Sequence, residues 1–81
     1  MIKDFVEYMV KSIVEKPEAV FVQYMHNDDG DYIEITVDQQ DRGKVIGREG
    51  QTIKALRVLV NQCAPENKKI TVDLIHASEN I

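Results

Sequence analysis

Two glycines separated by two charged residues, Gly47-Arg48-Glu49-Gly50, stand between two stretches with helical patterning. Glycine lacks Cβ and tolerates positive φ, so this spacing predicts a sharp turn that brings two helices close together. The second helix would point its first free N–H groups, and the positive end of its dipole, into that turn. Backbone amides arranged in this way can hold a phosphate group. The first chemistry that the sequence indicates is therefore the binding of a phosphate-bearing ligand.

The distribution of charge supports an anionic ligand at this turn, although the whole chain is acidic. The 81 residues carry ten Lys and Arg against fourteen Asp and Glu, for a formal net charge of −4. Between residues 42 and 57, five basic residues stand against one acidic residue, which gives +4, whereas the rest of the chain carries −8. Because fields close to a surface are set by nearby charges, the basic segment can attract an anion that the acidic remainder repels.

Motifs of enzymes are not recognisable in this chain. The glycine turn does not have the GxxxxGK[ST] spacing of a nucleotide-binding loop. Residues 38–49 carry several oxygen-bearing side chains, but not in the order that a calcium loop requires. Asp28, Asp29 and Asp31 cluster around a glycine and are expected to be solvated in a turn rather than catalytic. We therefore expect no enzyme activity.

The cysteine and the histidines do not form a metal or nucleophile pattern. Cys63 is the only cysteine, so the chain has no internal disulfide, and we expect a small buried thiol on a helix face. His26 and His76 have no ligand spacing with Cys63 or with each other, and both are expected at strand ends. We expect neither a cofactor nor a metal.

Hydrophobic periodicity predicts one small α+β domain spanning residues 1–81. Apolar residues at helical spacing predict a first helix ended by Pro17 and a long helix ended by Pro65. Alternating apolar residues predict three strands, the first two forming a hairpin around Gly30. The expected elements are a helix at 2–16, strands at 19–26 and 32–38, a short helix at 39–46, a helix at 51–64, a strand at 68–75 and a frayed tail at 76–81. We expect the helices to pack on one face of the three-stranded sheet.

Apolar residues on both sides of the glycine turn predict a groove beside it. Val45 and Ile46 precede the turn and Ile53 follows it, and the apolar edge of strand 32–38 is expected to form the far wall. Phosphates held on one side and an apolar wall on the other suit a single-stranded nucleic acid whose bases pack against the wall. A duplex keeps its bases inside and does not suit such a slot.

The segment from Ile46 to Ile53 reads IGREGQTI and resembles the I-G-x-x-G-x-x-I signature of KH domains, extended here by IKALR at residues 53–57. The order of elements resembles the bacterial type II arrangement, helix-strand-strand-helix-GxxG-helix-strand, and over nearly its whole length the chain is similar to the KhpA family of small bacterial KH proteins. The resemblance implies single-stranded RNA binding, with the GxxG loop clamping about four nucleotides of backbone. The residues that it implicates in RNA binding are Lys44, Ile46, Gly47, Arg48, Glu49, Gly50, Ile53, Lys54 and Arg57.

The same resemblance implies partners. It implies a homodimer, and pairing with a larger KH-containing protein, KhpB, also called Jag or EloR, in RNA chaperoning and in the control of cell elongation and wall synthesis. The chain has no apolar run as long as a membrane span, and no signal peptide is recognisable in its first residues. We therefore expect a cytoplasmic protein that does not contact a membrane.

Two alternatives stay open from the residues alone. The glycines could serve only as a tight connection between two helices. The fold could also serve as a dimerisation or adaptor module with little or no RNA binding, using the wide apolar stripe of helix 2–16 or Val58 as its contact surface. Glu49 places a negative charge at the loop tip, which at an exposed site weakens phosphate binding only modestly.

Overall fold

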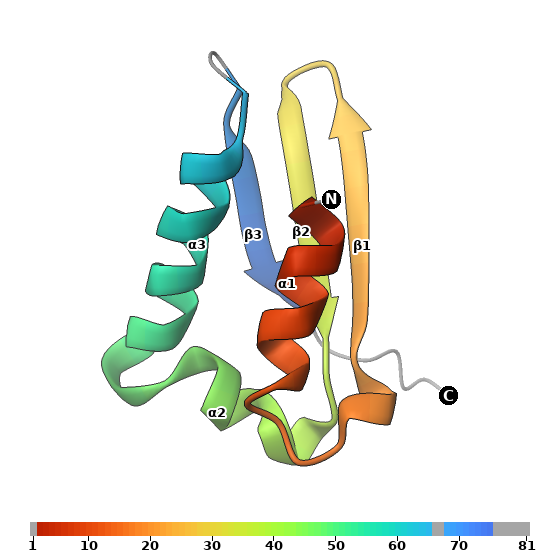
Figure 1. Ribbon diagram of the computed structural model, residues 1–81, viewed down its shortest axis with the longest axis vertical. Helices are drawn as coiled ribbons and strands as arrows, with labels where there is room; N and C mark the ends of the chain where they lie inside the picture. Colours follow the sequence, from red (N-terminus) through yellow and green to blue (C-terminus); the bar gives the residue numbers. More distant parts are fainter. Residues whose placement is uncertain (1, 66–67, 76–81) are drawn as a thin grey trace.

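The computed structural model describes residues 2–65 and 68–75, so the predictions for His76 and for a tail at 76–81 lie outside the described residues. Its elements, in order, are α1 (Ile2–Lys11), the 3-10 turn η1 (Pro17–Ala19), β1 (Phe21–Asn27), β2 (Gly30–Thr36), the 3-10 turn η2 (Gln39–Asp41), α2 (Arg42–Ile46), the 3-10 turn η3 (Arg48–Gly50), α3 (Gln51–Cys63) and β3 (Ile70–Leu74). The three α-helices lie on one face of a three-stranded sheet (Figure 1), which confirms the predicted α+β class.

The sheet has the order β1-β2-β3 and is mixed. β1 and β2 form the predicted antiparallel hairpin, with Val22 opposite Ile35. β2 and β3 are parallel, with Ile33 opposite Val72. Parallel neighbours cannot be joined by a tight turn, so α2, the glycine turn and α3 together make the crossover between them. The glycine turn therefore lies at the end of the molecule opposite the β1–β2 turn (Figure 1).

The core lies between the sheet and the helices. Alternation along β2 turns Ile33 and Ile35 inward, and Val37 continues the pattern just past the strand, as predicted. Burying each such side chain stabilises the fold by about 1.5–3 kcal/mol. The buried apolar residues are Val6, Val10, Val20, Val22, Ile33, Ile35, Val37, Val45, Ile53, Leu56, Val60, Ile70 and Val72.

α1 ends at Lys11, well short of the end at residue 16 that periodicity predicted. The cause is the buried carboxylate of Asp41, which accepts hydrogen bonds from the amides of Glu15 (3.0 Å) and Lys16 (3.1 Å). These amides cannot also continue a helix, so the chain leaves α1 and passes over the start of α2. Pro17 consequently begins η1 and does not terminate α1.

Cys63 is exposed, and the prediction of a buried thiol was wrong. α3 buries Leu56 and Val60 as expected, but Leu59 of the same predicted face retains 42% of its surface exposed. Periodicity identifies which side of a helix is apolar, but it does not reveal how much of that side a neighbouring element covers. Cys63 is the last residue of α3, and its side chain is exposed at that end of the helix.

Asp31 is only 3% exposed, so the expectation that it is solvated in the turn was wrong, whereas Asp28 and Asp29 are exposed. Its carboxylate accepts a hydrogen bond from the hydroxyl of Tyr24 and lies 2.7 Å from Nδ1 of His26. The Lys68 ammonium, in the link between α3 and β3, approaches the same carboxylate to 3.4 Å. The side chain therefore ties the hairpin to that link.

These contacts favour the charged form of Asp31. The hydrogen bond from Tyr24 is the main reason that the pKa of Asp31 lies below its ordinary value of 3.8. Burial opposes this shift, while His26 and Lys68 add to it. The same hydrogen bond, with burial, raises the pKa of Tyr24 to about 12.

Replacing Asp41 by alanine should destabilise the fold by about 1.5–3 kcal/mol, because two amides lose a charged acceptor. Urea unfolding monitored by circular dichroism measures the change. Asp29→Ala, at an exposed position of the β1–β2 turn, serves as the control and should change stability little. A loss no larger for Asp41→Ala than for this control would contradict the role assigned to Asp41.

Asp31→Asn should make the stability less dependent on pH. A carboxylate with a lowered folded pKa contributes its full stability above its unfolded pKa, close to 3.8, and loses it as pH falls through the folded value. The variant should therefore be less stable than the wild type at pH 7, with the difference shrinking below pH 3.8. Unfolding curves of the wild type and of Asp31→Asn, recorded across pH, test this prediction. A difference in stability that stayed constant with pH would contradict it.

Candidate nucleic-acid interface

The GxxG loop, residues 47–50, turns the chain from α2 into α3. α2 ends where Gly47 adopts φ 80° and ψ 174°, a combination that is essentially restricted to glycine. Glu49 and Gly50 follow with φ values of 57° and 73°. Three of the four loop residues thus have positive φ, and the chain reverses within a single 3-10 turn before α3 begins.

Gly47 is required by space as well as by its backbone conformation. A Cβ at this position would lie 2.2 Å from Oγ1 and 2.7 Å from Cβ of Thr52, closer than real Cβ atoms approach. Gly50 differs, because the nearest atom that its Cβ would meet is Cε of Lys54, at 3.9 Å. The first glycine therefore lets α2 and α3 pack closely, whereas the second only supplies the left-handed conformation that starts α3.

The tip of the loop is open to solvent. Arg48 and Glu49 are both exposed, as predicted. Glu49 is the one non-glycine residue with positive φ in the described part of the chain, a conformation that costs roughly 1 kcal/mol. Within the described ranges, no side chain caps the N-terminus of α3. No carboxylate in residues 2–65 or 68–75 therefore blocks the end of α3 that was predicted to receive a phosphate.

Lys44, which was predicted to bind RNA, is paired with acidic side chains of the fold. Its ammonium is 2.7 Å from Oε2 of Glu15 and 4.0 Å from Oδ1 of Asp41. This places the charge over the link between α1 and β1. Lys44 thus helps to neutralise the acidic groups that hold α2 in place.

Arg57 is also held by the fold. Its Nε donates a 3.0 Å hydrogen bond to the carbonyl of Val72, and its guanidinium lies 3.9 Å from a carboxylate oxygen of Asp73. Arg48 and Lys54, by contrast, form no ion pair with any residue in the ranges 2–65 and 68–75. Of the four predicted basic contacts, these two are the cations beside the loop that are not engaged elsewhere.

The predicted apolar wall is arranged differently from expectation. Ile46 keeps 38% of its surface exposed beside the loop, but Val45 is fully buried and Ile53 is only 7% exposed. Ile53 therefore fixes the start of α3 in the core and does not offer a surface to a ligand. The strand at 32–38 is not the far wall, because β2 is central in the sheet and turns its apolar residues into the core.

A groove lies instead between β3 and the part of α3 that begins at Arg57. It is lined by Arg57, Val58, Asn61, Lys69, Ile70, Thr71 and Val72. Arg57 is the one lining residue that the predicted site included; the prediction lacked Val58, Asn61, Lys69, Ile70, Thr71 and Val72. The spacing of Lys54, Arg57 and Asn61 along one side of α3 was a signal, but the strand that faces this side is known only once the crossover is folded.

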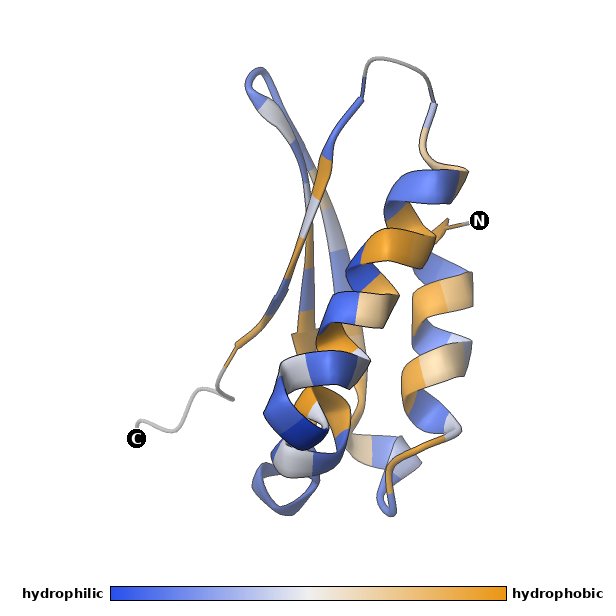
Figure 2. Cartoon of the chain, turned by 90° about the vertical axis from the view of Figure 1, so that its left-hand side faces the viewer, coloured by the Kyte–Doolittle hydropathy of each residue, from blue (hydrophilic) through white to orange (hydrophobic). Residues whose placement is uncertain are grey.

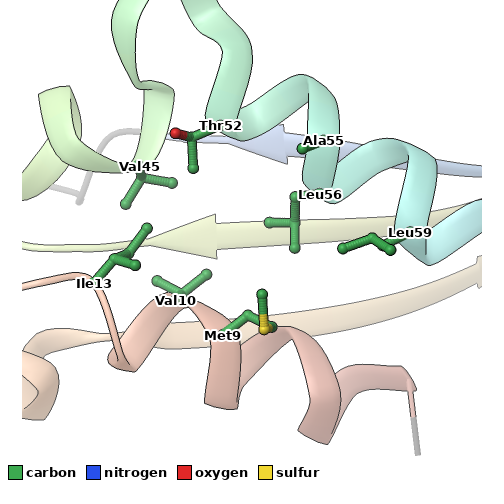
Figure 3. Close-up of a pocket in the computed structure, with 8 residues that line it drawn as sticks. All are labelled: Met9, Val10, Ile13, Val45, Thr52, Ala55, Leu56 and Leu59. Carbon is green, nitrogen blue, oxygen red and sulfur yellow. The ribbon is translucent and has the colours of Figure 1, made fainter.

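A second, apolar cleft lies on the other side of α3. It encloses about 100 Å³, and Figure 3 shows its side chains converging from α1, α2, α3 and, for Ile13, the link that follows α1. The lining residues are Met9, Val10, Ile13, Val45, Thr52, Ala55, Leu56 and Leu59. Ile13 and Leu59 remain partly exposed at its rim, and hydrophobic stretches of α1 and α3 face each other in Figure 2.

Neither a membrane-spanning helix nor a cluster of metal-ligating side chains occurs in the described part of the chain. No helix in the described ranges is long and apolar enough to cross a membrane. His, Cys, Asp and Glu side chains do not gather there in groups of three or more that could hold a metal ion.

The fold and the loop together define a type II KH domain. This class has the order helix, strand, strand, helix, GxxG, helix, strand, with the last two strands parallel, as observed here. A solved structure of an Era variant from Aquifex aeolicus, bound to GDP and AlF4−, shares the fold with a TM-score of 0.60 over 93% of this chain and 29% of its own length. At 19% identity, this likeness concerns the fold alone.

The chain belongs to the KhpA/KhpB KH-domain family, whose model matches residues 3–75. RNA-binding protein KhpA of Clostridium perfringens is 42% identical over 74 residues, which cover 90% of this chain and 99% of that protein. The KhpA proteins of Chlamydia trachomatis and Thermotoga maritima are 39% and 34% identical over 90% of this chain, covering 95% and 97% of their own lengths. The predicted family and fold are thereby confirmed.

Alanine in place of each of three glycines should separate their roles. Gly43→Ala, inside α2 with nothing within 4 Å of the new Cβ, should stabilise the fold by about 0.5–1 kcal/mol. Gly50→Ala should cost about 1–2 kcal/mol through its positive φ. Gly47→Ala should cost the most, because Thr52 must also move. Melting temperatures give the order, and a Gly47→Ala protein as stable as Gly50→Ala would contradict the packing role of Gly47.

Proposed function

We propose that this protein binds single-stranded RNA through the GxxG loop and the α3/β3 groove. The observation that carries the proposal is the exposed, uncapped start of α3, with Arg48 and Lys54 beside it and not engaged in ion pairs within the described ranges. Relatives that match over nearly their full length are named RNA-binding protein KhpA, which supports the same ligand class.

The sugar–phosphate backbone would be held at the loop. Within the 3-10 turn, the amides of Gly50 and Gln51 donate to the carbonyls of Gly47 and Arg48. The helix dipole and the other amides of the first turn of α3 favour a phosphate oxygen there. Without a side chain at Gly47 or Gly50, the backbone of the RNA can approach these amides closely. Arg48 and Lys54 add positive charge, and Glu49 subtracts part of it at an exposed position where screening is strong.

The bases would lie in the α3/β3 groove. Val58 is 60% exposed along it and offers an apolar surface, while Thr71 offers a small half-buried side chain. The groove has no aromatic residue among its lining side chains, so base stacking on the protein contributes little. We therefore expect weak affinity for a single copy, which two linked copies would raise through effective concentration.

Family membership supports three further proposals. We propose that the protein acts in the bacterial cytoplasm, forms a homodimer, and pairs with a KhpB protein in the control of cell elongation and wall synthesis. The family name joins KhpA and KhpB, which is consistent with such a pairing. The apolar cleft between α1 and α3, with Ile13 and Leu59 at its rim, is the surface that we propose for contact between chains.

The same cleft favours an alternative function. If the protein serves only as an adaptor, the apolar surface of α1 and α3 would be its working site and the GxxG loop only a helix connection. A folded dimer that binds no single-stranded RNA at low salt would favour this adaptor function. RNA binding would instead show a log–log salt slope of about −2 to −3, from roughly four phosphate contacts.

Replacing both Arg48 and Glu49 by aspartate should lower RNA affinity at least about tenfold, because two like charges would face the phosphates at close range. The melting temperature should change little, since both side chains are exposed. Fluorescence anisotropy with a labelled single-stranded RNA measures the affinity.

The matched control is Lys3→Asp, which lowers the net charge by the same two units at the first turn of α1, where an acidic residue suits the helix dipole. Its RNA affinity should stay close to that of the wild type. Equal losses in the two variants would mean that net charge, and not the loop, governs binding.

A further inference from the structure

The outer edge of β3 is occupied by side chains of α3. β3 pairs with β2 on one side only, so the backbone groups of Ile70 and Val72 on its other side face the groove. The amide of Asn61 forms two hydrogen bonds with Ile70: Oδ1 accepts from the N–H and Nδ2 donates to the C=O, each at 3.0 Å. Arg57 Nε donates to the carbonyl of Val72, also at 3.0 Å.

An edge strand normally presents unpaired N–H and C=O groups to whatever lies beside it. In a groove that holds bases, an N–H and a C=O group lying side by side could form hydrogen bonds with the edge of one base better than with the edge of another. The side-chain amide of Asn61 has the same adjacent donor and acceptor and already satisfies both groups of Ile70. A third hydrogen bond, from Nδ2 to the carbonyl of Arg57, holds Asn61 against its own helix.

We propose that Asn61 makes the α3/β3 groove insensitive to base identity by taking the place that a base edge would occupy on Ile70. The inference rests on the proposed RNA binding and adds a residue that sets its specificity. With Asn61 in place, bases meet the side chains of Val58 and Thr71, and the loop holds the phosphates. Without Asn61, the backbone of Ile70 becomes available to read a base.

The test compares single-stranded RNA octamers of A, C or U for binding to the full chain and to Asn61→Ala, by fluorescence anisotropy. The wild type should bind all three within about threefold, because contacts that do not involve base edges tolerate any base. Asn61→Ala should spread the three affinities by at least about fivefold, the smallest discrimination expected of a bidentate contact. Gln62→Ala, the exposed neighbour on α3, is the matched control and should keep the wild-type spread.

A second measurement uses only the wild type, so it holds even if Asn61→Ala does not fold. In the NMR spectrum, the nuclear Overhauser contact between the Asn61 side-chain amide and the Ile70 amide should persist when an octamer is added, while the amides of residues 47–50 shift. Loss of that contact, with the loop still shifting, would overturn the role of Asn61 and leave RNA binding intact. An Asn61→Ala protein with the wild-type spread would overturn it as well. Absence of any shift at low salt would instead remove RNA binding and this inference together.

Discussion

The approach of Gly47 to Thr52 is the constraint on which the rest of the site depends. Any side chain at Gly47 would overlap Thr52, so only glycine lets α2 and α3 meet at this distance. The close meeting places Val45 and Ile53 together in the core on either side of the turn. It also forces the two residues between the glycines outward. One small contact therefore sets both the packing of the helices and the exposure of the loop.

Some charged side chains stabilise the fold, and others remain available to a ligand. Asp41 binds backbone amides at the end of α1, and Asp31 joins the hairpin to the link before β3. Lys44 and Arg57 lie in the basic segment but are paired within the fold. Most of the positive charge that remains for an anion is therefore concentrated at the loop and the first turn of α3, although the chain as a whole is acidic.

Much of the fold was predictable from local patterns, and the departures have long-range causes. The alternation of Ile33 and Ile35 identified a half-buried strand, and the two glycines identified the turn. The end of α1 could not be predicted, because Asp41 acts on amides that precede it by 25 and 26 residues. Asp31 is held mainly by Tyr24 and His26 of its own hairpin, and no local pattern indicates its additional contact with Lys68, 37 residues further along the chain.

For the candidate site, the sequence by itself determined the loop, its exposed tip and the basic residues around it. These features follow from the backbone conformation of glycine and from charged residues that are close together in the sequence. Only the tertiary structure decided which strand faces α3, which basic side chains are already engaged, and that Ile53 belongs to the core. It alone revealed Asn61 on the edge of β3. The physical reason is that a parallel crossover brings distant segments together, and each side chain finds its partner only after that crossover has formed.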